Sequence, residues 1–325
     1  MFRHRFAVAA ILVIVLLGGA YGVASVVVWD KLTKVPDDCE RKWGANSPQS
    51  FTVPSPDALN TTPWAMPAPE EVILSSRDPG IAIAGWWLPS STADAPAVIV
   101  VHGFTACRRD HDVLLPAGML HRNGFSILLI DLRDHGDSTI EDGRFAGGTD
   151  EYRDVLGAWD WLQAEQRVPA GKIGLVGISL GAATVLLAAG QEPGVAAVWE
   201  DSSYADLDSA IQAELARDGY PGFLAAGGVL AARIISGDDL VSYSPLDAVR
   251  RLEGRPLFIT HGDADTRLSV QYARDLHAAV RGTGGSVGIW LVPGAGHTAA
   301  IVTHAPEYER RLVDFFKQSL GLPGR

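Results

Sequence analysis

The residues with the clearest chemical potential surround one serine. Residues 177–181 read Gly-Ile-Ser-Leu-Gly, after a β-rich run at 172–176 and before an alanine- and leucine-rich run at 182–189. A strand–turn–helix setting of this kind exposes a serine hydroxyl at a strand end, beside a helix N-terminus that favours negative charge. Glycines are needed because the turn leaves no space for flanking side chains. We therefore predict that Ser179 is a nucleophile; the alternative is a glycine-rich turn whose serine has no chemical role.

A serine hydroxyl becomes nucleophilic only when a base removes its proton and an acid orients that base. Two later segments offer such groups. The apolar run 255–260 leads into His261-Gly-Asp263-Ala-Asp265, and the run 287–292 leads into a loop that ends at His297. We predict that His297 is the base and that Asp263 or Asp265 is the acid. Nucleophile, acid and base follow one another in the order seen in one class of serine hydrolases.

Five motifs in order resemble the serine α/β-hydrolase superfamily, over about residues 70–320. Besides the two regions above, residues 97–104 resemble the third strand with its oxyanion loop, and 243–247 the entry to the penultimate strand. Residues 131–138 resemble the Asp-x-Arg-Gly-His-Gly-x-Ser element, with Asp134 where glycine is usual. The resemblance implies an α/β fold with a mostly parallel central sheet, helices on both faces and no cofactor. It implies no substrate, because this fold hosts many chemistries.

The resemblance also bears on the choice between the two aspartates. The family pattern His-Gly-x-x-Asp places the acid at Asp265. Asp263 lies nearer the strand end, where we expect it to accept backbone N–H bonds in the turn. An oxyanion formed on attack needs two N–H donors, which we expect from Leu180 and, in the loop after the third strand, Phe104.

Other polar residues near these motifs receive structural interpretations. Arg108 and Arg109 border the oxyanion loop, where we expect a solvated loop face; holding an anionic substrate group is the alternative. No metal is expected at the histidine and aspartates of 261–265, since no second histidine sits at helical spacing. Three histidines are expected to brace loops by hydrogen bonds: His102, His135 and His261.

The N-terminus carries an uncharged apolar run from Phe6 to Val28, and its length suits a bilayer span of about 20 residues. Arg3 and Arg5 precede it, and Trp29 suits a membrane interface. We predict that residues 1–29 form a transmembrane anchor, N-terminus inside and catalytic domain extracytoplasmic. The alternatives are a signal sequence cleaved after residues 22–24, which gives a secreted protein, and a buried helix of a soluble one. The anchor is expected to contribute nothing to the site.

Composition indicates an ordinary packed globule, with 47% hydrophobic residues in 325. The net charge of −11, without a basic stripe, argues against nucleic acid as a partner. Cys39 and Cys107 are the only cysteines. In an oxidising compartment we expect them to pair; the alternative is two separate buried thiols.

Residues 30–69 predict an extended linker that leads into the hydrolase domain at 70–325, and its aromatics Trp43, Phe51 and Trp64 indicate that it packs on the domain. The segment holds many prolines: Pro36, Pro48, Pro54, Pro56, Pro63, Pro67 and Pro69. Residues 72–76 and 81–88 predict an antiparallel hairpin, after which strands and helices alternate. Residues 204–240 predict two short helices forming a small cap; a crossover helix with a loop is the alternative. Helices are expected to begin near Asp112, Asp150, Ser179, Ser269 and Ala305.

Together these features predict a membrane-anchored serine hydrolase that cleaves carboxylic esters through an acyl-enzyme. Its expected partners are a small acyl substrate and the membrane. Hydrolysis of an amide, peptide or thioester by the same residues is the second hypothesis. A hydrolase fold that only binds ligands is the third, which the intact Ser, Asp and His set disfavours.

Overall fold

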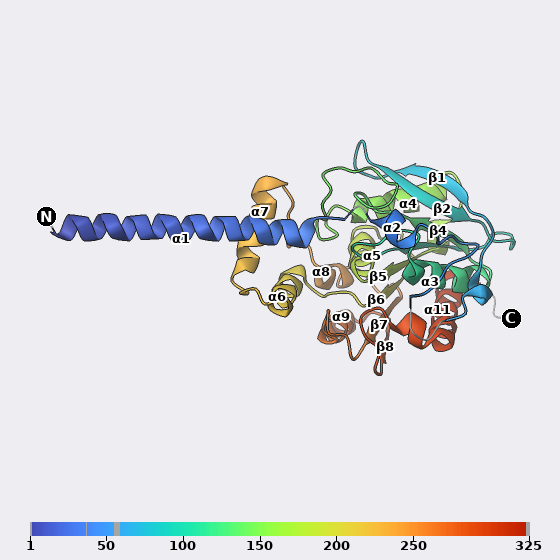
Figure 1. Ribbon diagram of the computed structural model, residues 1–325. Helices are drawn as coiled ribbons and strands as arrows, with labels where there is room; N and C mark the ends of the chain where they lie inside the picture. Colours follow the sequence, from blue (N-terminus) through green and yellow to red (C-terminus); the bar gives the residue numbers. More distant parts are fainter. Residues whose placement is uncertain (1, 37, 55–58, 323–325) are drawn as a thin grey trace.

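A computed structural model describes residues 2–36, 38–54 and 59–322. A long N-terminal helix, α1 (Phe2–Thr33), projects from an α/β domain (Figure 1). Some residues of the predicted segments lie outside the described residues: Pro56 of the linker, residue 1 of the anchor, and residues 323–325 of the hydrolase domain.

The central sheet has eight strands in the order β1-β2-β4-β3-β5-β6-β7-β8. β2 pairs antiparallel with β1 and β4, and the other neighbours pair in parallel. The predicted hairpin and mostly parallel sheet are therefore confirmed. The strands are β1 (Glu70–Ser75), β2 (Ala82–Leu88), β3 (Ala97–Val101), β4 (Ser126–Ile130), β5 (Ile173–Ile178), β6 (Ala197–Asp201), β7 (Leu257–Gly262) and β8 (Val287–Val292).

Helices cover both faces of this sheet, because strands buried on both sides need an apolar layer on each. The helices of the domain are α3 (His111–His121), α4 (Tyr152–Ala164), α5 (Leu180–Gln191), α8 (Pro245–Val249), α9 (Gln271–Gly282), α10 (Ala300–Thr303) and α11 (Ala305–Leu320). One core cluster joins α4, α5, α8 and α9 to the sheet, and the second joins α3 and α11. The five predicted helix starts are each confirmed to within two residues.

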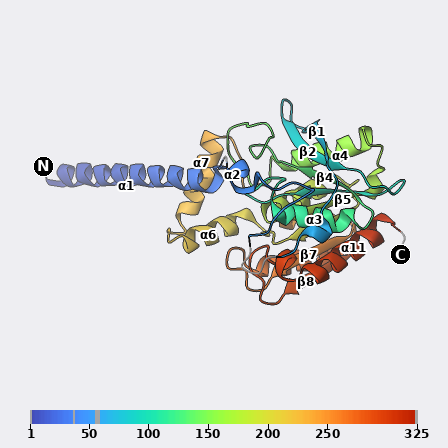
Figure 2. The same ribbon diagram turned by 45° about the vertical axis from the view of Figure 1, so that its right-hand side comes forward.

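Two helices follow β6 and form the predicted cap: α6 (Leu207–Arg217) and α7 (Leu224–Ile235). α7 lies across α1 where α1 meets the domain (Figures 1 and 2). Val28 and Trp29 of α1 share a core cluster with Leu224 of α7 and Leu215 of α6. The cap therefore packs on the N-terminal helix as well as on the domain.

The N-terminal helix does not end at residue 29, the predicted end of the anchor, but continues to Thr33. Its last turn is tied to the domain: Phe145 N–H donates to the Thr33 carbonyl, and Asp30 pairs with Arg144 at 2.8 Å. Arg144 also lies over the Trp29 ring, 3.7 Å from its centroid. α1 is long and apolar enough to cross a membrane, and its hydrophobic window is mostly exposed.

The lead-in between α1 and β1 packs on the domain near the oxyanion loop. It contains α2 (Cys39–Trp43) and a short 3₁₀ turn, η1 (Thr62–Trp64). Cys39 at the start of α2 forms a disulfide with Cys107, with 6.0 Å between the Cα atoms. Phe51 and Trp64 are buried against the α3 side of the sheet, so this segment is not a free linker.

Candidate active site

Ser179 sits in a sharp turn between β5 and α5, with φ of +55° and ψ of −114°. Positive φ is strained for a residue with a side chain, and it turns the hydroxyl out at the strand end. A Cβ on Gly177 would collide with the backbone of Gly181, and one on Gly181 with the carbonyls of Val101 and His102. Close backbone approach therefore requires both glycines, as the sequence predicts.

The structure brings Ser179 together with the two later segments. Ser179 Oγ lies 2.8 Å from His297 Nε2, and His297 Nδ1 lies 2.7 Å from Asp265 Oδ2. The Asp265 side chain is fully buried, whereas that of His297 keeps 17% exposure. The three side chains come from the loops after β5, β7 and β8, which meet because parallel strands share one carboxyl edge.

Asp263 does not take part in this chain. Its Oδ1 accepts the Gly294 N–H at 2.7 Å and so joins the β7 and β8 loops. Asp265 Oδ1 accepts the N–H groups of Arg267 and Leu268 at 2.8 and 2.9 Å. These bonds leave Oδ2 of Asp265 to face His297.

A second histidine supports the Asp265 carboxylate. His261 Nε2 lies 2.9 Å from the Leu268 carbonyl and 3.3 Å from Asp265 Oδ2, two acceptors that it can satisfy only by donating. Burial alone would raise the pKa of Asp265, but hydrogen bonds from His261 and His297 outweigh it and hold that pKa well below its usual range. The carboxylate therefore stays charged. His261 was predicted only to brace a loop, and its contact with Asp265 was not foreseen.

The two expected oxyanion donors lie beside Ser179. Phe104 and Leu180 line the same cavity as the serine, and a Cβ on the neighbouring Gly103 would lie 3.3 Å from Ser179 Cβ. Within the described residues, neither the Phe104 nor the Leu180 amide donates to a protein acceptor. Both N–H groups are thus available to a ligand, as an oxyanion site requires.

The prediction that Arg108 lies on a solvated loop face is wrong. Its side chain is 3% exposed and pairs with Asp131 and, at 2.6 Å, with Asp137. Its amide also donates to Asp131 at 2.6 Å. A buried carboxylate needs a buried cation, so this pair ties the oxyanion loop to the loop after β4. Arg109 is 23% exposed and lies over Trp86, also away from the cavity.

Three further residues of these motifs, Asp134, His102 and His135, have local structural roles. Asp134, where glycine is usual, adopts φ of +62° and accepts the amides of Glu141, Asp142 and Gly143. His102 accepts the Leu132 N–H at 3.1 Å, and burial lowers its pKa to about 3. His135 Nδ1 lies 2.8 Å from the Arg133 carbonyl. Both histidines brace loops, as predicted.

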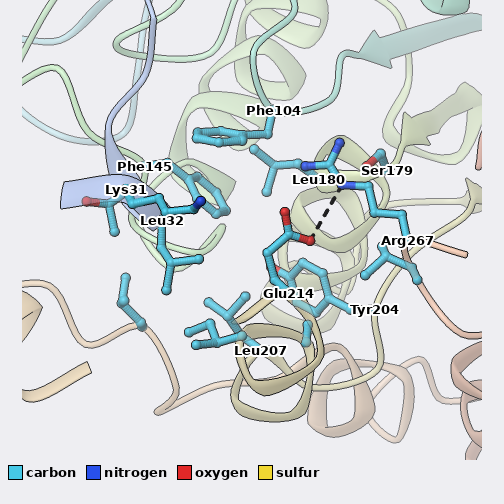
Figure 3. Close-up of a pocket in the computed structure, with 15 residues that line it drawn as sticks. Lys31, Leu32, Phe104, Phe145, Ser179, Leu180, Tyr204, Leu207, Glu214 and Arg267 are labelled. Carbon is cyan, nitrogen blue, oxygen red and sulfur yellow. Dashed lines mark ion pairs between the residues drawn. The ribbon is translucent and has the colours of Figure 1, made fainter. Parts of the chain in front are cut away.

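An apolar cavity opens beside Ser179, lined by side chains from the domain, the cap and the end of α1. Figure 3 shows Phe104 and Leu180 near the serine, and Lys31 and Leu32 from the end of α1 on the opposite side. Its apolar lining comes from seven separate segments: Leu32, Phe104, Phe145, Leu180, Leu207, Ile211, Leu240 and Leu268. Within the part of the predicted anchor whose side chains are described, residues 5–29, no side chain lines the cavity; the part of α1 that does lies just beyond it, at Lys31, Leu32 and Thr33.

The other side of Ser179 is polar. A smaller cavity there is lined by His297, Thr298, Asp110 and Asp112. Thr298 Oγ1 donates to Asp112 at 2.9 Å, and burial beside Asp110 raises the pKa of Asp112 to about 7. Asp110 and Asp112 flank His111, and its two ring nitrogens contact their carboxylates. These three side chains could bind a cation only if His111 gave up both contacts. The serine thus stands between an apolar and a polar cavity.

Sequence reasoning missed the cavity walls contributed by α1 and the cap. The wall residues from α1 and α6 belong to no sequence motif, and they meet only when the two helices pack together. These residues are Lys31, Leu32, Ile211 and Glu214. The one available signal is that the apolar run continues to Trp29, past the roughly 20 residues a bilayer needs, before the charged Asp30 and Lys31.

Comparisons with known proteins agree with this fold. Residues 117–323, more than half of the chain, match the prolyl oligopeptidase family. The uncharacterized protein YfhR of Escherichia coli (strain K12) is 26% identical over 278 residues, 83% of this chain and 87% of that protein. A thiohydrolase, AneE of Aspergillus aculeatus, is 30% identical over 30% of each chain.

Solved structures share the architecture at low identity. A Pyrococcus furiosus esterase superposes with a TM-score of 0.65 at 21% identity, covering 81% of this chain and 95% of that one. Pyrococcus horikoshii acylaminoacyl peptidase gives 0.60 at 18% identity, covering 79% of this chain but 42% of that one. The match across 117–323, the sheet order and the Gly-x-Ser-x-Gly turn agree: the chain belongs to the prolyl oligopeptidase family of serine hydrolases with the α/β-hydrolase fold.

Proposed function

We propose that this protein is a membrane-anchored serine hydrolase that cleaves carboxylic esters through an acyl-enzyme. The observation that carries the proposal is the hydrogen-bonded chain from Ser179 through His297 to buried Asp265, beside two free backbone N–H donors. A serine without chemistry, or a fold that only binds ligands, gives no reason for this arrangement.

The geometry supports a two-step reaction. His297 Nε2 takes the Ser179 proton as Oγ attacks the ester carbonyl, and the oxyanion lies between the Phe104 and Leu180 amides. His297 then returns the proton to the departing alcohol oxygen, leaving the acyl group on Ser179. Water, deprotonated by His297, attacks this ester and releases the carboxylic acid, and Ser179 regains its proton. Asp265 stays ionised and stabilises the imidazolium throughout.

The shape of the site favours an ester over a peptide. The acyl side is a cavity whose lining is mostly apolar; it also holds one ion pair, in which Glu214 and Arg267 lie 3.9 Å apart (Figure 3). Apolar walls bind hydrocarbon well but give a peptide backbone few partners. Amide or thioester cleavage uses the same residues and is separated by the assay below.

A second part of the proposal concerns location. α1 crosses the membrane once, with the domain on the extracytoplasmic side. The disulfide between Cys39 and Cys107 supports an oxidising compartment. Cleavage after residues 22–24 would remove Tyr21, which stacks on Phe223 of the cap and donates to its carbonyl. An uncleaved anchor keeps that contact.

The proposal is tested on full-length protein in detergent, first by labelling with a fluorophosphonate probe. We expect labelling at Ser179 in the wild type and none in Ser179→Ala. Acetyl and butyryl p-nitrophenyl esters, acyl thioesters and aminoacyl anilides are then compared. The proposal predicts the highest kcat/KM for the esters. Faster anilide cleavage would make the protein a peptidase, and absence of labelling would make it a binding module.

A further inference from the structure

The outer face of α7 is apolar and exposed. Leu230, Ile234 and Ile235 are 56%, 73% and 50% exposed, and Phe223 just before the helix is 67% exposed. We call these four residues the α7 patch. Arg233 is the one charged residue among the exposed positions of α7. Apolar side chains gathered on one exposed face usually mark an interaction surface.

α7 packs on α1 at close range, and the α7 patch flanks this contact, since Gly227 lies three and seven residues before Leu230 and Ile234 and so on the same side of the helix. A Cβ on Gly227 would collide with Ser25 Oγ, and one on Gly228 would lie 2.8 Å from Val28. The two helices cross at these glycines, so α7 lies crosswise to α1 (Figures 1 and 2). Tyr21 marks the outer edge of the contact, with its ring 6.1 Å from that of Phe223.

The free length of α1 fixes the level of this crossing. Residues 6–23 are exposed, and at about 1.5 Å per residue they extend about 27 Å. That length is close to the hydrocarbon thickness of a bilayer, about 30 Å. If this part fills the membrane, Tyr21 and the α7 patch lie at the boundary between hydrocarbon and head groups, where aromatic rings are favoured.

The cavity begins about three helical turns beyond this level. Leu32 and Thr33 line it, about 17 Å along the helix axis from Tyr21. Leu207, Ala210 and Ile211 of α6 line it as well, so α1 and the cap together form its membrane-side wall. The Lys31 charge in this wall is not left unpaired, because its Nζ lies 2.7 Å from an Asp218 carboxylate oxygen. Apolar side chains predominate in the lining between this wall and Ser179, and the ion pair of Glu214 and Arg267 interrupts them.

We propose that the α7 patch inserts into the membrane interface beside α1, and that the substrate is a bilayer-resident acyl ester whose chain enters the cavity from the membrane. This inference rests on the proposed esterase function. We assign the bilayer as the partner of the α7 patch, because the patch adjoins the exposed apolar part of α1, which itself requires a membrane. A polar leaving group would lie on the other side of Ser179, in the cavity lined by Asp112 and Thr298.

The test uses full-length protein reconstituted in phosphatidylcholine vesicles and two substrates with one leaving group. The first is 4-methylumbelliferyl palmitate incorporated in the vesicles, and the second is 4-methylumbelliferyl acetate in solution. The test variants are Ile234→Gln and the double variant Leu230→Gln/Ile234→Gln, because glutamine keeps helix propensity. Ile73→Gln is the matched control: Ile73 is 69% exposed, on edge strand β1 away from α7 (Figure 1).

We expect the double variant to lose about tenfold or more in palmitate hydrolysis, the fold-change that about 1.4 kcal/mol of lost interfacial binding produces. Acetate hydrolysis should stay within about twofold in every variant, which also reports that each is folded, and Ile73→Gln should match the wild type on both substrates. Equal palmitate rates in wild type and double variant, with acetate hydrolysis intact, would overturn the inference alone. Inactivity of the wild type on both esters would overturn the proposed function.

A second copy of the chain is the competing occupant. Light scattering of wild type and double variant in detergent distinguishes the two. If the substitutions convert a dimer to a monomer, the patch is a subunit interface and the bilayer assignment is wrong. An unchanged oligomeric state together with the palmitate-specific loss supports the bilayer.

Discussion

At the residue scale, the reactivity of Ser179 depends on a strained backbone as much as on its hydroxyl. Ser179→Ala removes only Oγ and leaves the turn glycines in place, so the fold should persist. We expect a loss of about 10⁴-fold or more in kcat/KM on p-nitrophenyl esters, as in comparable hydrolases. Ser91→Ala, at an exposed position in the loop between β2 and β3, serves as the control and should keep the wild-type rate. Near wild-type turnover in purified Ser179→Ala would refute the assignment.

Substitutions of the two aspartates after β7 should have clearly different effects. Asp265→Asn removes the acceptor for His297 Nδ1 and favours the wrong imidazole tautomer, so we expect a fall of roughly 10⁴-fold in kcat. Asp263→Asn weakens one hydrogen bond to Gly294 N–H and should cost about 1 kcal/mol of stability, with kcat little changed. Activity and urea unfolding of both variants are measured in parallel. The opposite pattern would show that Asp263 is the acid.

A buried carboxyl outside the site makes stability depend on pH. Burial raises the pKa of Glu151 from 4.5 to about 8, and its Oε1 accepts the Ala146 N–H. The folded state therefore binds this proton more tightly than the unfolded state, and the stability contribution present below about pH 4.5 is lost as pH rises through about 8.

Glu151→Gln keeps a neutral side chain at every pH. Relative to wild type, its free energy of unfolding should rise by on the order of 1 to 3 kcal/mol between about pH 5 and pH 9. Burial raises the pKa of Glu200 to about 8 as well, but Glu200 is present in both proteins and cancels in the difference. Urea unfolding at the two pH values checks this, and parallel stability curves would contradict it.

At the element scale, the disulfide joins the lead-in helix α2 to the loop that carries Phe104. Its two cysteines are 68 residues apart, so the bond restricts a long loop of the unfolded chain. Replacing both with serine should cost about 2 to 4 kcal/mol of stability and lower Tm. The loss of activity should be small beside this loss of stability, because the ion pair between Arg108 and Asp131 also holds the loop in place. Thermal unfolding with and without reductant tests this: an equal Tm in both would contradict the prediction.

The elements that could be predicted from the sequence are those set by local patterns. The hairpin, the helix starts and the turn around Ser179 follow from periodicity and turn residues, and the position of Asp265 follows from its distance past a strand. Arg108 could not be placed, because its burial depends on Asp131, which is distant in sequence. The cavity walls could not be predicted either, since α1, α6 and the Phe145 loop contribute to them without any shared motif.

At the scale of the whole molecule, the N-terminal helix has two parts with different roles. Residues 6–23 are exposed and suited to lipid, whereas Val28 and Trp29 are buried against the cap and Leu32 lines the cavity. A single helix can thus fix both the height of the domain above a membrane and one wall of its cavity. The boundary between the exposed part of α1 and the part that packs on the cap lies within the helix, near Ala24, and not at its end.

Two truncations separate these roles, each produced behind the same cleavable signal sequence. Deleting residues 2–20 removes the lipid-facing part but keeps Tyr21, Ser25 and the buried turn. We expect this form to hydrolyse p-nitrophenyl butyrate in mild detergent within about threefold of the full-length rate, because the cavity is intact. Deleting residues 2–33 removes Val28 and Trp29, whose burial contributes roughly 1.5 to 3 kcal/mol each, and the partly buried Leu32. It should lower Tm and reduce kcat/KM at least tenfold. Equal activity of both truncations would show that α1 is only an anchor, and that the cap is held in place by the domain alone.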